Sequence, residues 1–113
     1  MRFLAHYTLY DGSILHLNVV DFEENKVSYF SVKEETAHTL FIEGILMICN
    51  ELDAENLKLI NEDLKVIGLK SVKEIAEYIN TNMEKYQIDK SRKLCAYQIK
   101  DIGLERYYIS QLV

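Results

Sequence analysis

Residues 2–32 read RFLAHYTLYDGSILHLNVVDFEENKVSYFSV, three runs of alternating apolar residues separated by Asp11-Gly12 and by the polar segment 23–26. An apolar residue at every second position is typical of a strand with one buried face. Short polar or glycine-containing breaks between such runs are typical of hairpin turns. The stretch therefore predicts a three-stranded antiparallel meander whose second hairpin closes at Glu24-Asn25.

Two registers are open for the first hairpin. A two-residue turn at Asp11-Gly12 would place Tyr10 opposite Ser13, whereas a three-residue loop over residues 11–13 would place Tyr10 opposite Ile14. A shift of one residue moves every side chain of a strand to the other face of the sheet. We predict the three-residue loop, because it gathers the apolar side chains on one face. Those side chains are Phe3, Ala5, Tyr7, Leu9, Leu15, Leu17, Val19, Phe30 and Val32.

The other face of the predicted meander is also partly apolar. A helix that covers the first face cannot cover this one as well, so its apolar side chains need another partner. Tyrosine supplies both contact area and a hydrogen-bonding tip at interfaces. We therefore expect this face to contact another protein or a second copy of the chain. Its candidate interface residues are Leu4, Tyr10, Ile14, Val20 and Tyr29.

The clearest helix signal lies in the second half of the chain. Ser71 followed by Glu74 forms a capping box, and apolar residues recur behind it at helical spacing. This pattern predicts one main helix over residues 71–86. Residues 53–67 fit both a helix and two short strands, and we predict a helix over 53–61.

Two further regions read as strands. The apolar run 40–49 is interrupted at Glu43-Gly44, either by a hairpin or by a break in one strand buried on both faces, and we favour the broken strand. The alternating runs 94–101 and 105–113 predict a C-terminal hairpin joined around Ile102-Gly103, with Tyr97 opposite Tyr108. The predicted fold is α+β, with an antiparallel sheet shaped as a half-barrel or a small sandwich.

The composition bounds the class of protein. With 113 residues, 49% of them apolar, the chain is long enough for one hydrophobic core and too short for two domains, so residues 1–113 form a single predicted domain. The formal net charge of −5 disfavours partners that carry many phosphates, namely nucleic acids and anionic membranes. The partners that we expect are therefore proteins.

The two cysteines indicate a reducing compartment. Cys49 and Cys95 both lie within apolar runs, where a reduced thiol packs as a small hydrophobic group. The chain starts directly on strand-like alternation, so we expect neither a signal peptide nor a transmembrane segment. These observations favour a cytoplasmic protein.

No group of residues has the spacing of a catalytic, metal or cofactor site. In the predicted register His6 and His16 are diagonal neighbours on one face, so they are the best metal-ligand candidates. Zinc requires four ligands, or three and a water, and nothing fixes a third ligand beside them, although the loop 34–39 follows the meander. We therefore expect no bound metal, no cofactor and no catalytic residues.

Residues 1–50 contain, in order, the strand Ala5-His6-Tyr7, a turn, the run 15–20, an acidic turn, the strand 27–32 and the run Phe41-Ile42-Glu43-Gly44-Ile45-Leu46. This order resembles the small β-domain that precedes the barrel in the amidohydrolase superfamily of metal hydrolases. The resemblance implies a free-standing β-module that docks on a larger enzyme. It does not extend to the family's metal site, because no histidine follows His38, and a (β/α)8 barrel needs about 250 residues.

Taken together, these observations favour a non-catalytic role. We expect a protein-interaction or homo-oligomerising module that uses the second face of the sheet. The alternative is a small-molecule- or metal-binding protein, with minor enzymatic activity, centred on His6, His16 and the loop 34–39. A concave pocket that holds both histidines would favour the alternative.

Overall fold

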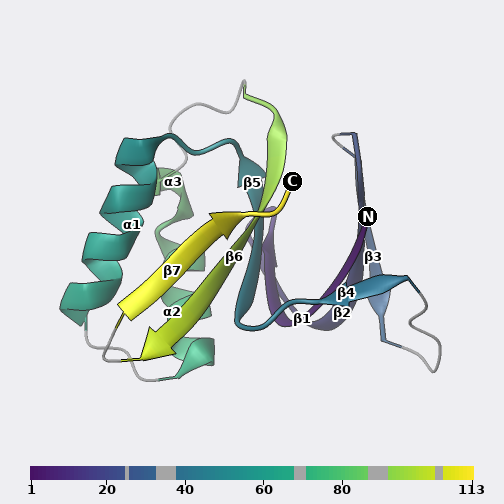
Figure 1. The fold of residues 1–113 in the computed structure, drawn as a ribbon, viewed down its shortest axis with the longest axis horizontal. Helices are drawn as coiled ribbons and strands as arrows, with labels where there is room; N and C mark the ends of the chain where they lie inside the picture. Colours follow the sequence, from purple (N-terminus) through teal and green to yellow (C-terminus); the bar gives the residue numbers. More distant parts are fainter. Residues whose placement is uncertain (25, 33–37, 68–70, 87–91, 104–105) are drawn as a thin grey trace.

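The computed structural model describes residues 1–24, 26–32, 38–67, 71–86, 92–103 and 106–113. Within these ranges seven strands form one sheet in the order β3-β2-β1-β5-β6-β7, with β4 also paired to β1, and helices lie on one side of it (Figure 1). This confirms the predicted α+β fold. The elements are β1 (Arg2–Tyr10), β2 (Ser13–Glu23), β3 (Lys26–Ser31), β4 (Thr39–Phe41), β5 (Ile45–Asn50), α1 (Ala54–Ile67), α2 (Val72–Thr81), α3 (Met83–Tyr86), β6 (Leu94–Gly103) and β7 (Arg106–Gln111).

The sheet is mostly antiparallel. β1, β2 and β3 form the predicted meander, and β5, β6 and β7 are also antiparallel neighbours. β4 and β5 instead run parallel to β1 and lie along it one after the other. The predicted break at Glu43-Gly44 is therefore confirmed, and the alternative of a hairpin is not. The predicted burial on both faces holds for β5 but is wrong for β4, where Leu40 and Phe41 are more than half exposed. Gly44 makes the bend with a φ of 88°, a conformation that favours glycine.

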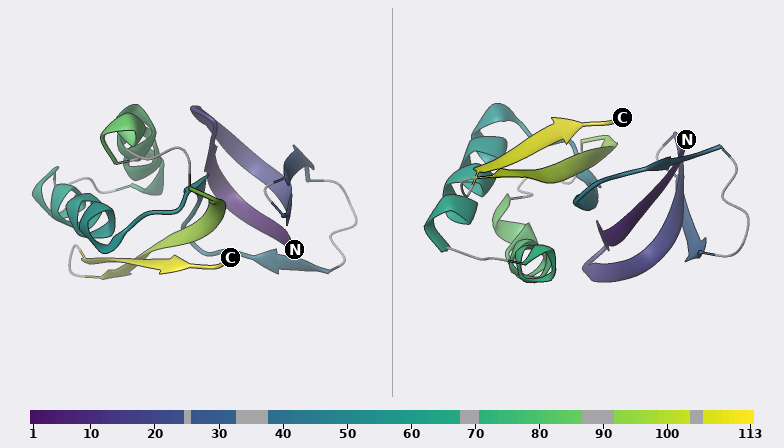
Figure 2. Two further views of the ribbon diagram at one scale, coloured as in Figure 1. Left: turned by 90° about the horizontal axis from the view of Figure 1, so that it is seen from above. Right: turned by 60° about the horizontal axis from the view of Figure 1, so that its bottom comes forward.

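β5 is buried on both of its faces. Ile45, Met47 and Cys49 belong to a first core cluster, which lies between the sheet and the helices. Leu46 and Ile48 belong to a second core cluster, around which the N-terminal strands curl (Figure 2). The sheet is open and curled, which is nearer to the half-barrel of the two predicted shapes.

The register of the first hairpin corrects our prediction. Tyr10 lies opposite Ser13, so Asp11 and Gly12 form a two-residue turn, and the predicted three-residue loop is wrong. Both turn residues have positive φ, 49° and 78°, which is the backbone that matches the twist of a hairpin and that the sequence Asp-Gly favours.

The apolar pattern led to the wrong register because the buried face of the first hairpin changes midway along its strands. Phe3, Ala5 and Leu9 are separated by even numbers of residues, so they point to the same side of β1. Phe3 and Ala5 nevertheless belong to the second cluster, whereas Leu9 belongs to the first. The change occurs near Leu17, whose φ of 52° interrupts the extended backbone of β2. Each face of the hairpin is thus buried over part of its length. The predicted register placed all apolar residues on one face, which would hold only if the hairpin faced a single core.

The other two hairpins form, and one register is confirmed. Glu23 lies opposite Lys26 and Val19 opposite Phe30, as the closing turn at Glu24-Asn25 requires. In the C-terminal hairpin Tyr97 lies opposite Gln111, so the predicted pairing with Tyr108 is wrong. The reason is that β6 continues to Gly103, past the point where we placed the turn.

The helices begin where side chains cap them. The carboxylate of Asp53 accepts a hydrogen bond from the Asn56 backbone N–H at 2.8 Å, and α1 extends beyond the predicted residue 61 to Ile67. The Ser71 hydroxyl accepts a bond from the Glu74 backbone N–H at 3.1 Å, as the capping box predicts. The predicted helix 71–86 is divided at Asn82 into α2 and α3. Its apolar stripe is nevertheless buried, with Ile75, Ala76, Ile79 and Tyr86 in the first cluster.

We predict that Ile79→Ala destabilises the protein far more than Glu77→Ala. Ile79 is fully buried in the first cluster, so its truncation removes apolar contacts and leaves a cavity, at a cost of about 2 to 5 kcal/mol. Glu77 is exposed on the other side of α2, and its truncation should cost about 0.5 kcal/mol or less. Urea unfolding measures both values. Equal midpoints would contradict the placement of α2.

A second prediction concerns Gly44→Ala. A Cβ at Gly44 would collide with the backbone carbonyl of Ile99, and the positive φ adds strain, so we expect a loss of at least about 2 kcal/mol. Gly12→Ala is the matched control, because Gly12 also has positive φ but a Cβ there would meet open space, and about 1 kcal/mol is expected. Thermal unfolding of both variants checks the difference. A Gly44 variant as stable as the Gly12 variant would refute the close approach of β5 to β6.

Candidate functional site

The structure does not bring the two candidate metal ligands together. The His16 ring lies 5.3 Å from that of Tyr7, its partner across β1 and β2. The His6 ring instead lies 6.0 Å from that of Phe41 on β4, edge to face. Among the described residues no group of three or more His, Cys, Asp or Glu side chains is placed to hold a metal ion. Of the loop 34–39, residues 34–37 lie outside the described ranges.

The five candidate interface residues do not share one face either. Val20 is fully buried in the second cluster, against which Tyr10 also packs. The Tyr29 ring lies 6.2 Å from that of Tyr10, while Ile14 packs against the first cluster. Leu4 lies elsewhere, opposite Val19. This dispersal follows directly from the corrected register.

A different apolar surface emerges on the convex side of the meander. Phe30, Val19, Leu4 and Phe41 lie directly opposite one another across β3, β2, β1 and β4, so their side chains form one line on one face of the sheet. We call these four residues the outer row. Phe41 is 61% exposed and Phe30 40% exposed, whereas Val19 between them is covered.

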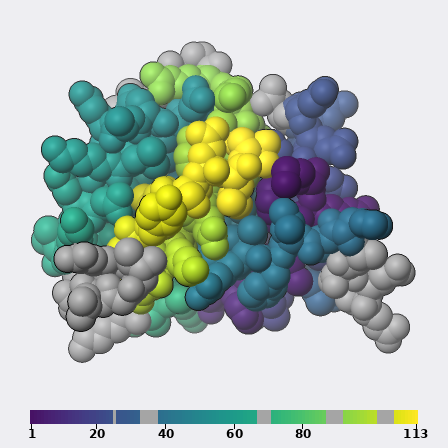
Figure 3. All heavy atoms as spheres, in the orientation of Figure 1, coloured from purple at the N-terminus to yellow at the C-terminus, as the bar shows by residue number. Residues whose placement is uncertain are grey.

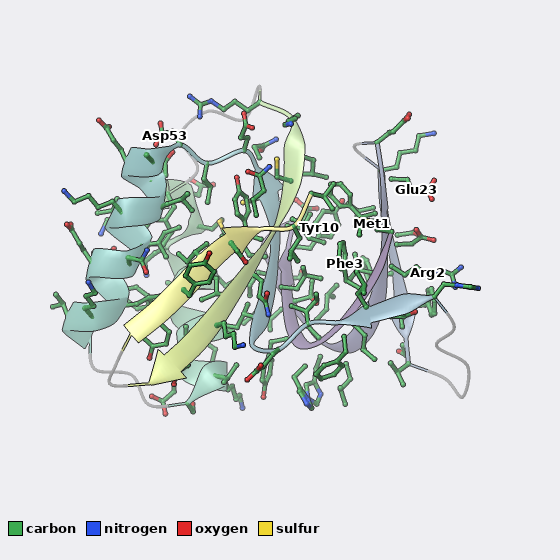
Figure 4. All side chains as sticks on the ribbon, viewed as in Figure 1. Met1, Arg2, Phe3, Tyr10, Glu23 and Asp53 are labelled. Atoms are coloured by element: carbon green, nitrogen blue, oxygen red, sulfur yellow. The ribbon has the colours of Figure 1, made fainter. Side chains whose placement is uncertain are left out.

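The outer row lies away from the helices. Figures 1 and 2 show α1, α2 and α3 at one end of the molecule and β3 and β4 at the other. In the space-filling view β4 lies at the surface beside the N-terminus (Figure 3). Figure 4 shows Phe3 and Tyr10 within the hollow of the curl, while Arg2 projects outward. The described helices therefore leave this surface uncovered.

The outer row has apolar neighbours on one side and a charged pair on the other. Leu17 and Val32 are each about two-fifths exposed, and the Val32 backbone N–H donates to the Leu17 carbonyl at 3.2 Å. On the other flank the Arg2 guanidinium lies 5.9 Å from the centre of the Phe30 ring and 3.4 Å from the Asp21 carboxylate. The surface thus combines aromatic and aliphatic groups with an internally paired charge, a composition typical of protein interfaces.

A cavity of about 550 Å³ lies at the opposite end of β1, where β1 and β5 both end. Its volume falls in the range of small-molecule sites, about 300 to 1,000 Å³. Its walls come from β1 and the turn after it, from β5, from α2 and α3, and from the start of β6. The lining residues are Leu9, Tyr10, Asp11, Gly12, Ile48, Cys49, Asn50, Asn80, Met83, Glu84 and Leu94.

The cavity has no activated thiol. Cys49 lies directly opposite Cys95 on β6, and both are buried and free, as their apolar surroundings predicted. Burial and the neighbouring Cys95 raise the pKa of Cys49 to about 12. The thiol is therefore protonated near neutral pH, and a protonated thiol is neither a good nucleophile nor a metal ligand.

A second titratable cluster joins α1 to α3. The Asp63 carboxylate accepts hydrogen bonds from the Lys85 ammonium at 2.9 Å and the Tyr86 hydroxyl at 2.8 Å. These bonds lower the pKa of Asp63, while burial raises the pKa of Tyr86. Every group in the cluster is held in its ordinary protonation state. The arrangement therefore ties the two helices together and offers no acid or base for catalysis.

Sequence reasoning missed both surfaces for identifiable reasons. Phe30 and Val19 were assigned to the buried face because alternation does not tell which face a helix covers. Phe41 was assigned, with the rest of the apolar run 40–49, to one broken strand buried on both faces. The cavity joins segments that are far apart in the chain, so no local motif marks it. Only the Asp11-Gly12 turn was visible beforehand.

No described helix is long and apolar enough to cross a membrane. In the comparisons with known proteins no family model matches the chain, and neither a curated protein nor a solved structure matches it. The resemblance of residues 1–50 to the amidohydrolase β-domain therefore stays a prediction, and the site must be interpreted from its own residues.

Proposed function

We propose that the protein is a non-catalytic interaction module that forms a homodimer through its outer row. The observation that supports this most strongly is the line of four apolar side chains across β3, β2, β1 and β4, with an exposed phenylalanine at each end. Burying one such side chain contributes about 1.5 to 3 kcal/mol. Val19 is already buried, so the gain from the contact comes chiefly from covering the exposed parts of the Phe30 and Phe41 rings in both copies.

The chemistry of the surface favours a second copy as the partner. The charged side chains beside the outer row come in opposite pairs: Arg2 binds Asp21, and Glu23 lies opposite Lys26. In a twofold contact each copy can offer Arg2 to the Asp21 of the other, because such an interface is self-complementary. The rest of the chain carries the net charge of −5, so two copies repel least when they meet through this nearly neutral face.

The free edge of the meander adds a second attractive feature. β3 pairs with β2 on one side, and no described strand pairs with its other side. An unpaired edge presents backbone donors and acceptors to another chain. Because β3 also carries Phe30, one contact can engage both the edge and the outer row.

The alternative built on His6, His16 and the loop 34–39 has less support. The two imidazoles contact different rings, and the described residues place no third metal ligand beside either. A shallow pocket of about 360 Å³ includes His16 with Lys73 and Glu77, but it does not include His6. The geometry therefore favours the interaction module.

We expect light scattering of the purified protein to give twice the chain mass of 13.2 kDa. Phe41→Asp should convert the dimer to a monomer, because the twofold contact would bury two new carboxylates. Phe41 is 61% exposed, so the substitution should leave the folded monomer intact, as unchanged far-UV circular dichroism would show.

Tyr108→Asp is the matched control. Tyr108 is also an aromatic residue on a strand, it is 59% exposed, and it lies on β7 at the other end of the sheet. We expect this variant to stay dimeric. A wild-type protein that is monomeric at high concentration, or a Phe41 variant that remains dimeric, would refute the proposal.

A further inference from the structure

We propose that the cavity at the ends of β1 and β5 binds a small organic amine in its cationic form. The cavity shares no lining residue with the outer row, so this binding site is independent of the proposed dimer. It would give the module a small-molecule ligand.

The cavity arises from the topology of the sheet. β1 and β5 are adjacent and parallel, with Tyr10 paired to Ile48, so the two strands end at the same end of the sheet. Ligands commonly bind outside the carboxyl ends of parallel strands, because the chain diverges there and leaves a crevice. Here α2 and α3 stand beside that edge and contribute Asn80, Met83 and Glu84 to the wall.

One part of the wall is apolar. Leu9 and Ile48 are buried residues of the two core clusters that reach the strand ends, and Met83 and Leu94 are partly buried beside them. An apolar floor of this kind gains free energy by excluding water from the hydrocarbon part of a ligand. It offers nothing to a bare metal ion, which prefers oxygen ligands on most sides.

The polar part of the wall is negative. Among the described residues the lining contains no lysine, arginine or histidine, and its carboxylates belong to Asp11 and to Glu84, of which Glu84 already has another interaction. Asp11 makes no ion pair with any residue in the described ranges. A ligand that carries one positive charge fits this wall.

Asn80 links the helix to the turn and orients an acceptor. Its side-chain N–H donates to the Gly12 carbonyl at 3.2 Å, which holds the Asp11-Gly12 turn against the end of α2. That bond uses the Asn80 amide nitrogen, so the amide oxygen of the same side chain is the acceptor that Asn80 offers to the cavity, which Asp11 also lines. An ammonium group has three donors and no acceptor, so it can bond to more than one oxygen of the cavity wall at once. A neutral alcohol of the same shape has one donor only.

The test uses the intact protein and two probes, 2-phenylethylamine and its neutral counterpart 2-phenylethanol. We expect the amine to shift the NMR signals of the Gly12 backbone amide, the Asn80 side-chain amide and the Met83 methyl group in a saturable manner. The alcohol should bind at least about fivefold more weakly, because it lacks the charge that Asp11 attracts. Equal binding of the two probes would overturn the proposal.

Asp11→Asn separates charge from structure. Asparagine tolerates the positive φ of Asp11, so the turn should persist and the urea midpoint should stay unchanged. We expect about fivefold to tenfold weaker amine binding for this variant. Glu55→Gln, which removes an exposed carboxylate from the start of α1, is the matched control and should bind like the wild type.

Three results would overturn the proposal: unchanged amine binding by the Asp11 variant, equal weakening by the Glu55 control, or shifts that appear only outside the cavity. Calcium chloride provides a further arm, since stoichiometric calcium that displaces the amine would make this an inorganic cation site. None of these results bears on the dimer, whose test depends on Phe41.

Discussion

The rest of the structure depends on the burial of β5 from both sides. Its residues Ile45, Met47 and Cys49 require the helices on one face, and Leu46 and Ile48 require a cover on the other. A strand with this pattern can only lie in the interior of a sheet. Beside it, Tyr97 of β6 accepts a hydrogen bond from the Leu52 backbone N–H at 2.8 Å, which fixes the path from β5 into α1.

The position of β5 also explains why the described helices leave one surface of the meander uncovered. The second cluster needs Phe3, Ala5, Val20 and Phe22 to point inward, so the N-terminal strands curl around it. The residues that alternate with these four must then point outward, and they include Leu4 and Val19 of the outer row. The apolar outer surface is thus a consequence of building a second core with strands that are apolar on both sides. The proposed dimer contact would cover this surface.

Local sequence signals predicted the helices and strands, whereas the strand register and the packing of the elements were seen only in the structure. The Ser71–Glu74 capping box correctly predicted the start of α2, and the alternation of residues 2–32 with its break at Asp11-Gly12 correctly predicted the strands of the meander, although not the length of the turn. The register of β1 and β2 failed because it depends on which face meets which cluster, and Leu17 reverses that choice within β2. The cavity was beyond prediction for a related reason, since Asp11, Asn50 and Asn80 meet only after the strands have paired.

The measurement that tests this account most directly is the pairing of Leu4 observed by NMR. Met1 and Phe22 exchange backbone hydrogen bonds, so Leu4 and Val19, three residues further along each strand, form a non-hydrogen-bonded pair with closely spaced α-protons. The account predicts a strong nuclear Overhauser effect between the α-protons of Leu4 and Val19. A strong effect between Leu4 and Val20 instead would restore the three-residue loop, turn Val19 inward and remove the outer row.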